Sequence, residues 1–229
     1  MVFPARAMNR VFVCLAVCST LAGVTSCTIV HHGAGGGAEN DSAQKAAANA
    51  EFDAKAFVQT NWAAKVVPEL TRDAVDIRAV VAALKADQGA AEKQYGRRKD
   101  ETALFNFIVK GNEVIKSVNT TSAAGVIELT LSDGADSTVK LQIGPVIRSS
   151  AVRDALSFIN FGDFTNQLDF ANISKEFNFY IRDHIVADAA KAGAAGKHVS
   201  FVGAFAEDGS GQVLITPVQL ITPVQLSIQ

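Results

Sequence analysis

Residues 103–119 read ALFNFIVKGNEVIKSVN, and this stretch decides which fold we predict. It is rich in β-branched and aromatic residues as far as Val118, which favours a strand. Gly111 lies in its middle, and an internal glycine indicates a bulged or strongly bent strand. A small closed barrel needs such a strand, because one strand must pair with neighbours in both halves of the barrel.

Four more stretches with strand character follow, two of them directly and two after helical sequence at about 150–192. They are VIELTLSDG (126–134), STVKLQIGP (137–145), HVSFVGAFA (198–206) and QVLITPVQL (212–220). Asp133-Gly134 favours a hairpin between the first two. Three strands, a helical segment and two strands is the order of the five-stranded OB barrel. An open antiparallel sheet with helices on one face has the same order and is the alternative.

The sequence before these strands, residues 51–100, predicts a helical layer. Asp53 can cap a first helix, which Pro68 is expected to end. Its apolar face carries Val58, Trp62 and Val66, and a second helix over 72–87 buries Ile77, Val80, Val81 and Leu84. Arg97, Arg98 and Lys99 are expected to form a solvated loop.

We therefore predict an α+β fold with N-terminal helices, followed by a five-stranded antiparallel OB-like barrel with a helical segment between strands three and four. Residues 51–229 form a single domain in this prediction, with the helical layer at 51–100 and the barrel with its helical insertion at 101–229. The motif ITPVQL occurs at 215–220 and again at 221–226, so one copy is expected to pack in the last strand.

The first 27 residues resemble a bacterial lipoprotein signal. Arg6 and Arg10 precede an apolar run of roughly 13 residues, whereas a membrane span needs about 20. The run ends in V-T-S-C, where cleavage before the cysteine is expected. We predict that residues 1–26 are a signal peptide and that Cys27 acquires fatty acids such as palmitate, which bind the protein to a lipid bilayer. An ordinary signal peptide with a chance cysteine is the alternative.

Residues 27–50 contain a glycine-rich run and predict a flexible tether that spans about 25 Å root-mean-square. The tether would hold the folded body on the periplasmic side of the inner or outer membrane. His31 and His32 lie in it without carboxylate or cysteine partners at ligand spacing, so we predict no metal site.

Composition excludes several classes of function. The chain of 229 residues has a net charge of −2, and loss of the signal removes two arginines and no acidic residue, which leaves −4. A nucleic-acid-binding protein needs a basic face, so we expect no nucleic-acid partner. The cysteines, Cys14, Cys18 and Cys27, all precede the body, which excludes a disulfide scaffold. Phosphate-binding loops, dinucleotide fingerprints and zinc spacings are absent from the sequence, so no cofactor is expected.

The stretch IGPVIRSSAVRDALSFINFGDFTNQLDFA (143–171) is where we expect a binding site, because short polar residues alternate there with phenylalanines. Its two arginines could hold an anion. The candidate ligand- or partner-binding residues are Arg148, Arg153, Asp154, Asn160, Asp163, Asn166 and Gln167. In the alternative interpretation these residues are helix caps and structural ion pairs, and the phenylalanines are core.

A hydrolase that uses Ser149 or Ser150 with His184 or His198 is the enzymatic alternative. It requires a histidine nitrogen within hydrogen-bond reach of a serine oxygen. The sequence has no G-x-S-x-G motif to support it, so we predict that the protein is not an enzyme.

Three stretches, at 109–122, 141–171 and 196–205, resemble a bacterial family of predicted periplasmic lipoproteins of unknown function. This chain departs from the family pattern at Ser149-Ser150, where the family has Gly-Thr, and at Glu113, where a second glycine is usual. Some members are encoded beside sugar ABC transporters, so the resemblance implies an accessory envelope role linked to sugar uptake. We expect a protein that binds a small solute or a sugar-transport component, and a purely structural envelope protein is the remaining alternative.

Overall fold

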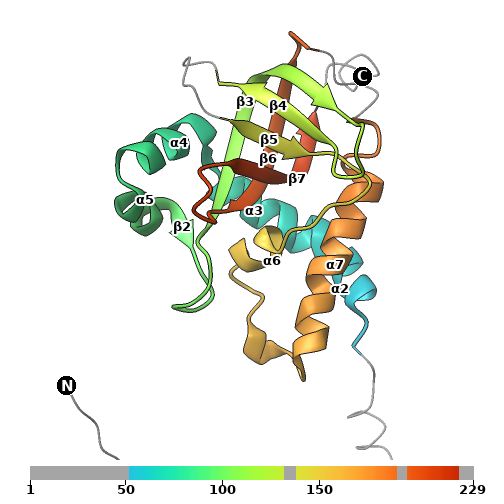
Figure 1. Ribbon diagram of the computed structural model, residues 1–229. Helices are drawn as coiled ribbons and strands as arrows, with labels where there is room; N and C mark the ends of the chain where they lie inside the picture. The colour runs from blue at the N-terminus through green and yellow to red at the C-terminus, as the bar shows by residue number, and fades with distance from the viewer. Residues whose placement is uncertain (1–51, 132–137, 190–194, 222–229) are drawn as a thin grey trace, which may run out of the picture. The chain divides into compact units, whose positions relative to one another are not determined.

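β3 (Asn106–Asn119) belongs to both halves of a closed barrel (Figure 1). From its start to Val114 it pairs with β6 (His198–Ala206), and from Val114 to its end it pairs with β4 (Val126–Thr130). The structure is a computed structural model that describes residues 52–131, 138–189 and 195–221. All of these residues belong to one unit, which spans residues 51–229.

The remaining pairings close the barrel. β4 pairs with β5 (Val139–Gln142), β5 pairs with β7 (Val213–Ile221), and β7 pairs with β6. The circuit is therefore β3–β4–β5–β7–β6 and back to β3. This confirms the predicted five-stranded OB-like barrel and excludes the open sheet.

The prediction that all strands are antiparallel is wrong for one pair, because β5 and β7 run parallel. Strand direction cannot alternate all the way around a closed ring that has an odd number of strands. One parallel pair is therefore unavoidable in a five-stranded barrel.

The irregularity in β3 lies beyond Gly111. The register with β4 shifts between Ile115 and Ser117, which places a bulge at Lys116. Gly111 has a different role, since a Cβ there would lie 2.9 Å from Ile77 Cγ2 and 2.9 Å from the Phe201 ring. The glycine thus allows the start of α4 to approach the barrel wall.

The helical layer begins with α2 (Ala54–Asn61), the π-helical turn η1 (Trp62–Val66) and α3 (Val67–Asp73), which follow one another without a break. Pro68 therefore does not end the helix. It lies in the first turn of α3, where its missing N–H removes no hydrogen bond within that helix. The layer continues with β1 (Val75–Asp76), α4 (Ile77–Ala86), α5 (Gln88–Tyr95) and β2 (Gly96–Arg97). β1 and β2 both pair with β3, so Arg97 lies in a short strand and not in a solvated loop.

The insertion between β5 and β6 consists of α6 (Ala151–Ala155), the 3₁₀ turn η2 (Phe161–Asp163) and α7 (Gln167–His184). α7 lies beside α2 (Figure 1). Trp62 joins the two helices, because its ring centroid lies 5.9 Å from that of Phe177 and 4.4 Å from that of Tyr180. The predicted apolar face of the first helix, Val58, Trp62 and Val66, is buried.

Alternating residues of the strands fill the barrel. Ile127 and Leu129 of β4 are buried, and Phe107 stacks on Phe205 at 5.1 Å. The first ITPVQL copy lies in β7, whereas the second beyond Ile221 is outside the described residues. The predicted signal, tether and Asp133-Gly134 turn are also outside them. Within the described residues, no helix combines the length and apolar character of a membrane span.

Candidate functional site

A charged cleft of about 520 Å³ lies where the end of α3, β2 with its following loop, and α6 with its following loop meet. We call it the charged cleft. Its lining residues are Arg72, Asp73, Gly96, Arg97, Arg98, Lys99, Asp154, Ala155, Leu156, Ser157 and Asn160. Four of these side chains are cationic and two are carboxylates. The volume lies within the range of roughly 300–1,000 Å³ that is typical of small-molecule sites.

Arg97 connects the three walls of the charged cleft. Its Nη2 donates to Asp73 Oδ2 at 2.7 Å, and its Nη1 donates to Glu69 Oε1 at 3.3 Å and to the Ala155 carbonyl at 3.2 Å. Arg72 binds the same Asp73 carboxylate with two bonds of 2.7 and 2.9 Å. The hydrogen bond from Arg72, assisted by Arg97, lowers the pKa of Asp73 to about 2 against the opposing effect of burial. Asp73 is therefore ionised throughout the neutral range.

Glu69 of α3 holds the loop after α6 in place. It is buried, with 7% of its surface exposed, although it is a carboxylate. Its Oε1 accepts the Ser157 amide at 2.6 Å in addition to the Arg97 bond. Buried charges occur almost only with such partners, so Glu69 fixes the position of Ser157 relative to α3.

Lys99 anchors the same loop from the other side. Its Nζ donates to the carbonyls of Leu156 and Ile159, the latter at 2.5 Å. Burial lowers the pKa of Lys99, while the charges of Asp154 and Glu69 act against that effect. The wall formed by residues 156–159 is thus held by two charged side chains before any ligand arrives.

Two arginines keep donors at the rim. The Arg72 side chain is 70% exposed and uses one edge of its guanidinium on Asp73. Arg98 donates to the Glu101 carbonyl at 3.1 Å and lies 4.7 Å from the Phe105 ring centroid. A guanidinium has five N–H donors, so both keep donors available for a carboxylate or phosphate group.

Of the seven residues predicted from the sequence, Asp154 and Asn160 line the charged cleft. Arg153 is bound to Asp154 at 2.8 Å and to the Phe170 carbonyl at 3.1 Å, with its guanidinium 3.8 Å from the Phe170 ring centroid. Its donors therefore hold α6 to α7. A role of Arg153 in binding stays a prediction.

The other predicted residues lie at helix ends or on the surface. Asn160 and Asp163 form a capping box around η2, and Asn166 caps α7 by accepting the Asp169 amide at 2.9 Å. Gln167, the first residue of α7, and Arg148 are exposed. Of these predicted residues, Asn160 alone lines the charged cleft with Asp154, and the other four do not.

The sequence-based prediction missed the basic residues of the cleft. Arg97, Arg98 and Lys99 were expected to be solvated, whereas Arg97 and Lys99 are partly buried and bonded to other segments. A signal for them exists in the sequence, because Glu69 and Asp73 are four residues apart and so share one helix face. Two acids on a face that is otherwise packed require cations from elsewhere in the chain.

The serines of the hydrolase alternative have other contacts. Ser149 Oγ accepts the Ala151 amide at 3.1 Å, and the His184 ring lies 4.4 Å from Tyr180. His198 is the first residue of β6. Among the described residues no hydrogen bond joins Ser149 or Ser150 to a histidine. In the same part of the chain, no group of three His, Cys, Asp or Glu side chains could hold a metal ion.

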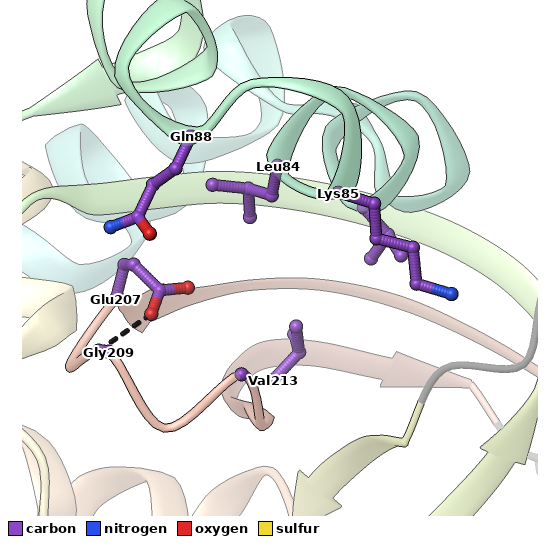
Figure 2. Close-up of a pocket in the computed structure, with 8 residues that line it drawn as sticks. Leu84, Lys85, Gln88, Glu207, Gly209 and Val213 are labelled. Carbon is purple, nitrogen blue, oxygen red and sulfur yellow. Dashed lines mark hydrogen bonds between the residues drawn. The ribbon is translucent and has the colours of Figure 1, made fainter.

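A second, smaller hollow of about 250 Å³ lies between α4 and the loop that joins β6 to β7 (Figure 2). Leu84 and Val213 provide apolar walls, while Gln88 and Glu207 face each other across its opening. Glu207 accepts the Gly209 amide at 2.7 Å and so braces its own loop. This hollow falls below the usual size of a small-molecule site, so the charged cleft is the stronger candidate.

A family described as predicted periplasmic lipoproteins (DUF2291) matches residues 17–221. The chain belongs to this family. The match begins within the apolar run before Cys27 and ends with β7. The predicted family and the lipid-anchored periplasmic location are thereby confirmed.

A solved structure supports the fold of this lipoprotein. An OB-fold protein from Thermotoga maritima is 17% identical, and the alignment covers 75% of this chain and 99% of that chain with a TM-score of 0.64. At this identity the likeness shows the fold alone. A comparison with curated proteins finds no match.

Proposed function

We propose that this periplasmic lipoprotein is an accessory protein that binds a small hydroxylated anion, such as a sugar acid or a sugar phosphate, in the charged cleft. The observation that carries the proposal is the excess of cations around a cleft of suitable size, with four cationic side chains against two carboxylates. Bidentate guanidinium contacts are the strongest that proteins make to carboxylate and phosphate groups.

The arrangement of the cleft favours binding because its walls are held before the ligand enters. Arg97 and Lys99 are already bonded to Asp73 and to backbone carbonyls, so few side chains have to be ordered on binding. Arg72 and Arg98 at the rim supply donors for the anionic group. Asp154 and Asn160 supply acceptors for hydroxyl groups.

An anchored solute-binding protein fits the link to sugar uptake that the family resemblance implies. We propose that the partner is a sugar-transport component in the same membrane system, and that the bound solute is passed to it. Anchoring both proteins at one surface raises the effective concentration of each for the other, which allows a weak contact to suffice.

Lipid attachment at Cys27 is part of the proposal. Several acyl chains on one cysteine anchor a protein durably, since each buried methylene contributes about 0.8 kcal/mol. Cells that make the protein should incorporate labelled palmitate into it, and Cys27→Ala should abolish the label. Unlabelled wild-type protein that washes into the soluble fraction would contradict this.

The solute-binding proposal can be tested by thermal unfolding of the mature chain with sugar acids, sugar phosphates and neutral sugars. A ligand at a hundred times its dissociation constant adds about 2.7 kcal/mol, or roughly 5–11 °C for a domain of this size. Arg98→Gln should weaken binding at least about tenfold, because it removes a charge-assisted contact. Arg182→Gln on α7 serves as the control, because Arg182 binds exposed Asp183.

Two outcomes would contradict the proposal. If no compound in the series shifts the transition, the cleft does not bind solutes of this class. If neutral sugars bind as well as their acids and Arg98→Gln has no effect, the excess positive charge is not used in recognition.

A further inference from the structure

Two apolar side chains stand out, Phe161 in η2 and Leu168 in the first turn of α7. Leu168 is 67% exposed and Phe161 is 55% exposed, the two highest values among the large apolar side chains of the described residues. Such exposure leaves apolar surface in contact with water, and large exposed apolar patches mark sites of contact with proteins or membranes.

Phe161 belongs to a larger aromatic cluster. Phe161 lies 5.5 Å from Phe170, Phe170 lies 5.7 Å from Phe164, and Phe164 lies 5.3 Å from Phe52 between ring centroids. We call this cluster, together with the exposed Leu168 in the first turn of α7, the aromatic end. It consists of Phe52, Phe57, Phe161, Phe164, Leu168 and Phe170.

The position of Phe52 relates the aromatic end to the lipid anchor. Phe52 is the residue at which the described structure begins, so the segment that leads to Cys27 enters the body at the aromatic end. Twenty-four residues, 28–51, lie between Cys27 and Phe52 in the sequence. Through the Phe52–Phe164 contact, the cluster is thus the part of the body that the chain from the anchor reaches first.

We propose that the aromatic end inserts Phe161 and Leu168 into the head-group region of the bilayer, which gives the lipoprotein a second membrane contact beside its acyl chains. Exposed Phe and Leu side chains favour the boundary between head groups and acyl chains, where they leave water. This contact would orient the body with α2 and the start of α7 towards the lipid. It does not depend on a ligand in the charged cleft.

The charges beside the aromatic end specify the kind of membrane contact. Asp163 is exposed next to Phe161, Asp169 follows Leu168, and Arg153 is bound to Asp154. The hollow beside Phe52 carries two cations and two carboxylates, namely Lys55, Lys175, Asp53 and Glu176, so acids outnumber cations around the aromatic end. A surface with this balance is not drawn to anionic lipid by charge. The contact is therefore apolar, and it should be independent of salt and of anionic lipid.

The proposal can be tested with a polarity-sensitive fluorophore on a single introduced cysteine in the acylated mature protein, reconstituted in phosphatidylcholine–phosphatidylethanolamine vesicles. No native cysteine follows Cys27, so Leu168→Cys provides a unique free thiol. Leu214→Cys on β7 is the matched control, because Leu214 is an exposed leucine (42%) of the barrel. We expect a blue-shifted emission and quenching by lipid-borne quenchers at position 168 and neither at position 214.

A second measurement uses the unacylated mature chain, made with Cys27→Ser, in a vesicle sedimentation assay. Phe161→Ser combined with Leu168→Ser should lower its partition coefficient at least about tenfold, because two apolar side chains no longer enter the lipid. Both residues are exposed, so the fold should be retained, which the thermal transition of the variant can verify. Binding should be similar at about 0.1 M and about 1 M salt.

Two results would overturn the proposal. Equal emission and equal quenching at positions 168 and 214 in vesicles would show that the aromatic end does not meet the lipid. Vesicle binding that disappears at high salt, or that is unchanged in the double serine variant, would assign the contact to charge or to another surface.

Discussion

Arg97→Gln tests whether the charged network holds the helical layer to the insertion. The substitution removes the guanidinium that bonds Asp73, Glu69 and the Ala155 carbonyl. Asp73 keeps Arg72 and Glu69 keeps the Ser157 amide, so neither carboxylate loses all its partners. The buried Glu69 charge nevertheless loses its cation.

The expected magnitude follows from these contacts. Hydrogen bonds to charged groups contribute about 1.5–3 kcal/mol each, but exposed ion pairs contribute about 0–1 kcal/mol. The Arg97 side chain is 37% exposed while Glu69 is almost fully buried, so the pair lies between these limits. We expect a loss of about 2 kcal/mol in the free energy of unfolding, or roughly 4–8 °C in Tm.

The assay is urea unfolding followed by the fluorescence of Trp62. This is the chain's one tryptophan, and it is buried against Phe177 and Tyr180, so its emission reports loss of the contact between η1 and α7. Arg182→Gln is the control and should change the stability by no more than about 0.5 kcal/mol. A double-mutant cycle with Glu69→Gln isolates the pairwise energy.

The reasoning is refuted if Arg97→Gln is as harmless as the control, or if the cycle gives no coupling between positions 97 and 69. Either result would mean that apolar packing alone positions the walls of the charged cleft. The preorganisation that supports solute binding would then have no energetic basis.

Three further predictions concern pH, backbone contact and the repeat. The pKa of Asp73 is lowered to about 2 from an ordinary 3.8, so its stabilisation is present above about pH 4 and is lost as the pH falls towards 2. Arg72→Gln brings the pKa of the folded state closer to 3.8, so it should make this acid-induced loss smaller in urea midpoints measured across that range. Gly144→Ala should lower the free energy of unfolding by about 1–3 kcal/mol, because a Cβ would lie 2.2 Å from the Gly125 nitrogen. Gly162→Ala is the control, because a Cβ there has nothing within 4 Å, and it should change the free energy of unfolding by less than about 0.5 kcal/mol. Equal effects of the two substitutions would contradict the close approach at Gly144. Deletion of residues 221–226 leaves one ITPVQL copy and should keep the barrel and its Tm within a few degrees, as seen by circular dichroism; unfolding would show that the second copy is structural.

The reason for a glycine at position 144 is visible only in the tertiary contacts. Gly144 belongs to the stretch at 141–171 that resembles the family, and the sequence alone indicated a binding site in this segment without giving the glycine a role. In the structure the amides of Ile143 and Gly144 both donate to the Gly125 carbonyl, at 2.9 and 3.0 Å. The glycine is thus needed because two backbone segments touch.

Only part of the lining of the charged cleft could be predicted from the sequence. Asp154 and Asn160 were singled out because they lie in a dense polar-aromatic segment, and they do line the charged cleft. Phe161 and Phe164 in the same segment both pack against Phe170, at the aromatic end. The residue types of this segment could not reveal that its polar residues and its phenylalanines take part in different surfaces.

Local patterns of the sequence by themselves determined the signal, the order of the five barrel strands with the helical insertion between the third and the fourth, and the apolar face of the first helix. These are properties of near neighbours along the chain, so periodicity and composition suffice to predict them. The tertiary structure alone decided that the barrel closes with one parallel pair, and that α3, β2 and the loop after α6 meet in a charged cleft. The cleft residues come from segments around positions 72, 97 and 156, and their meeting depends on how the whole chain folds around β3.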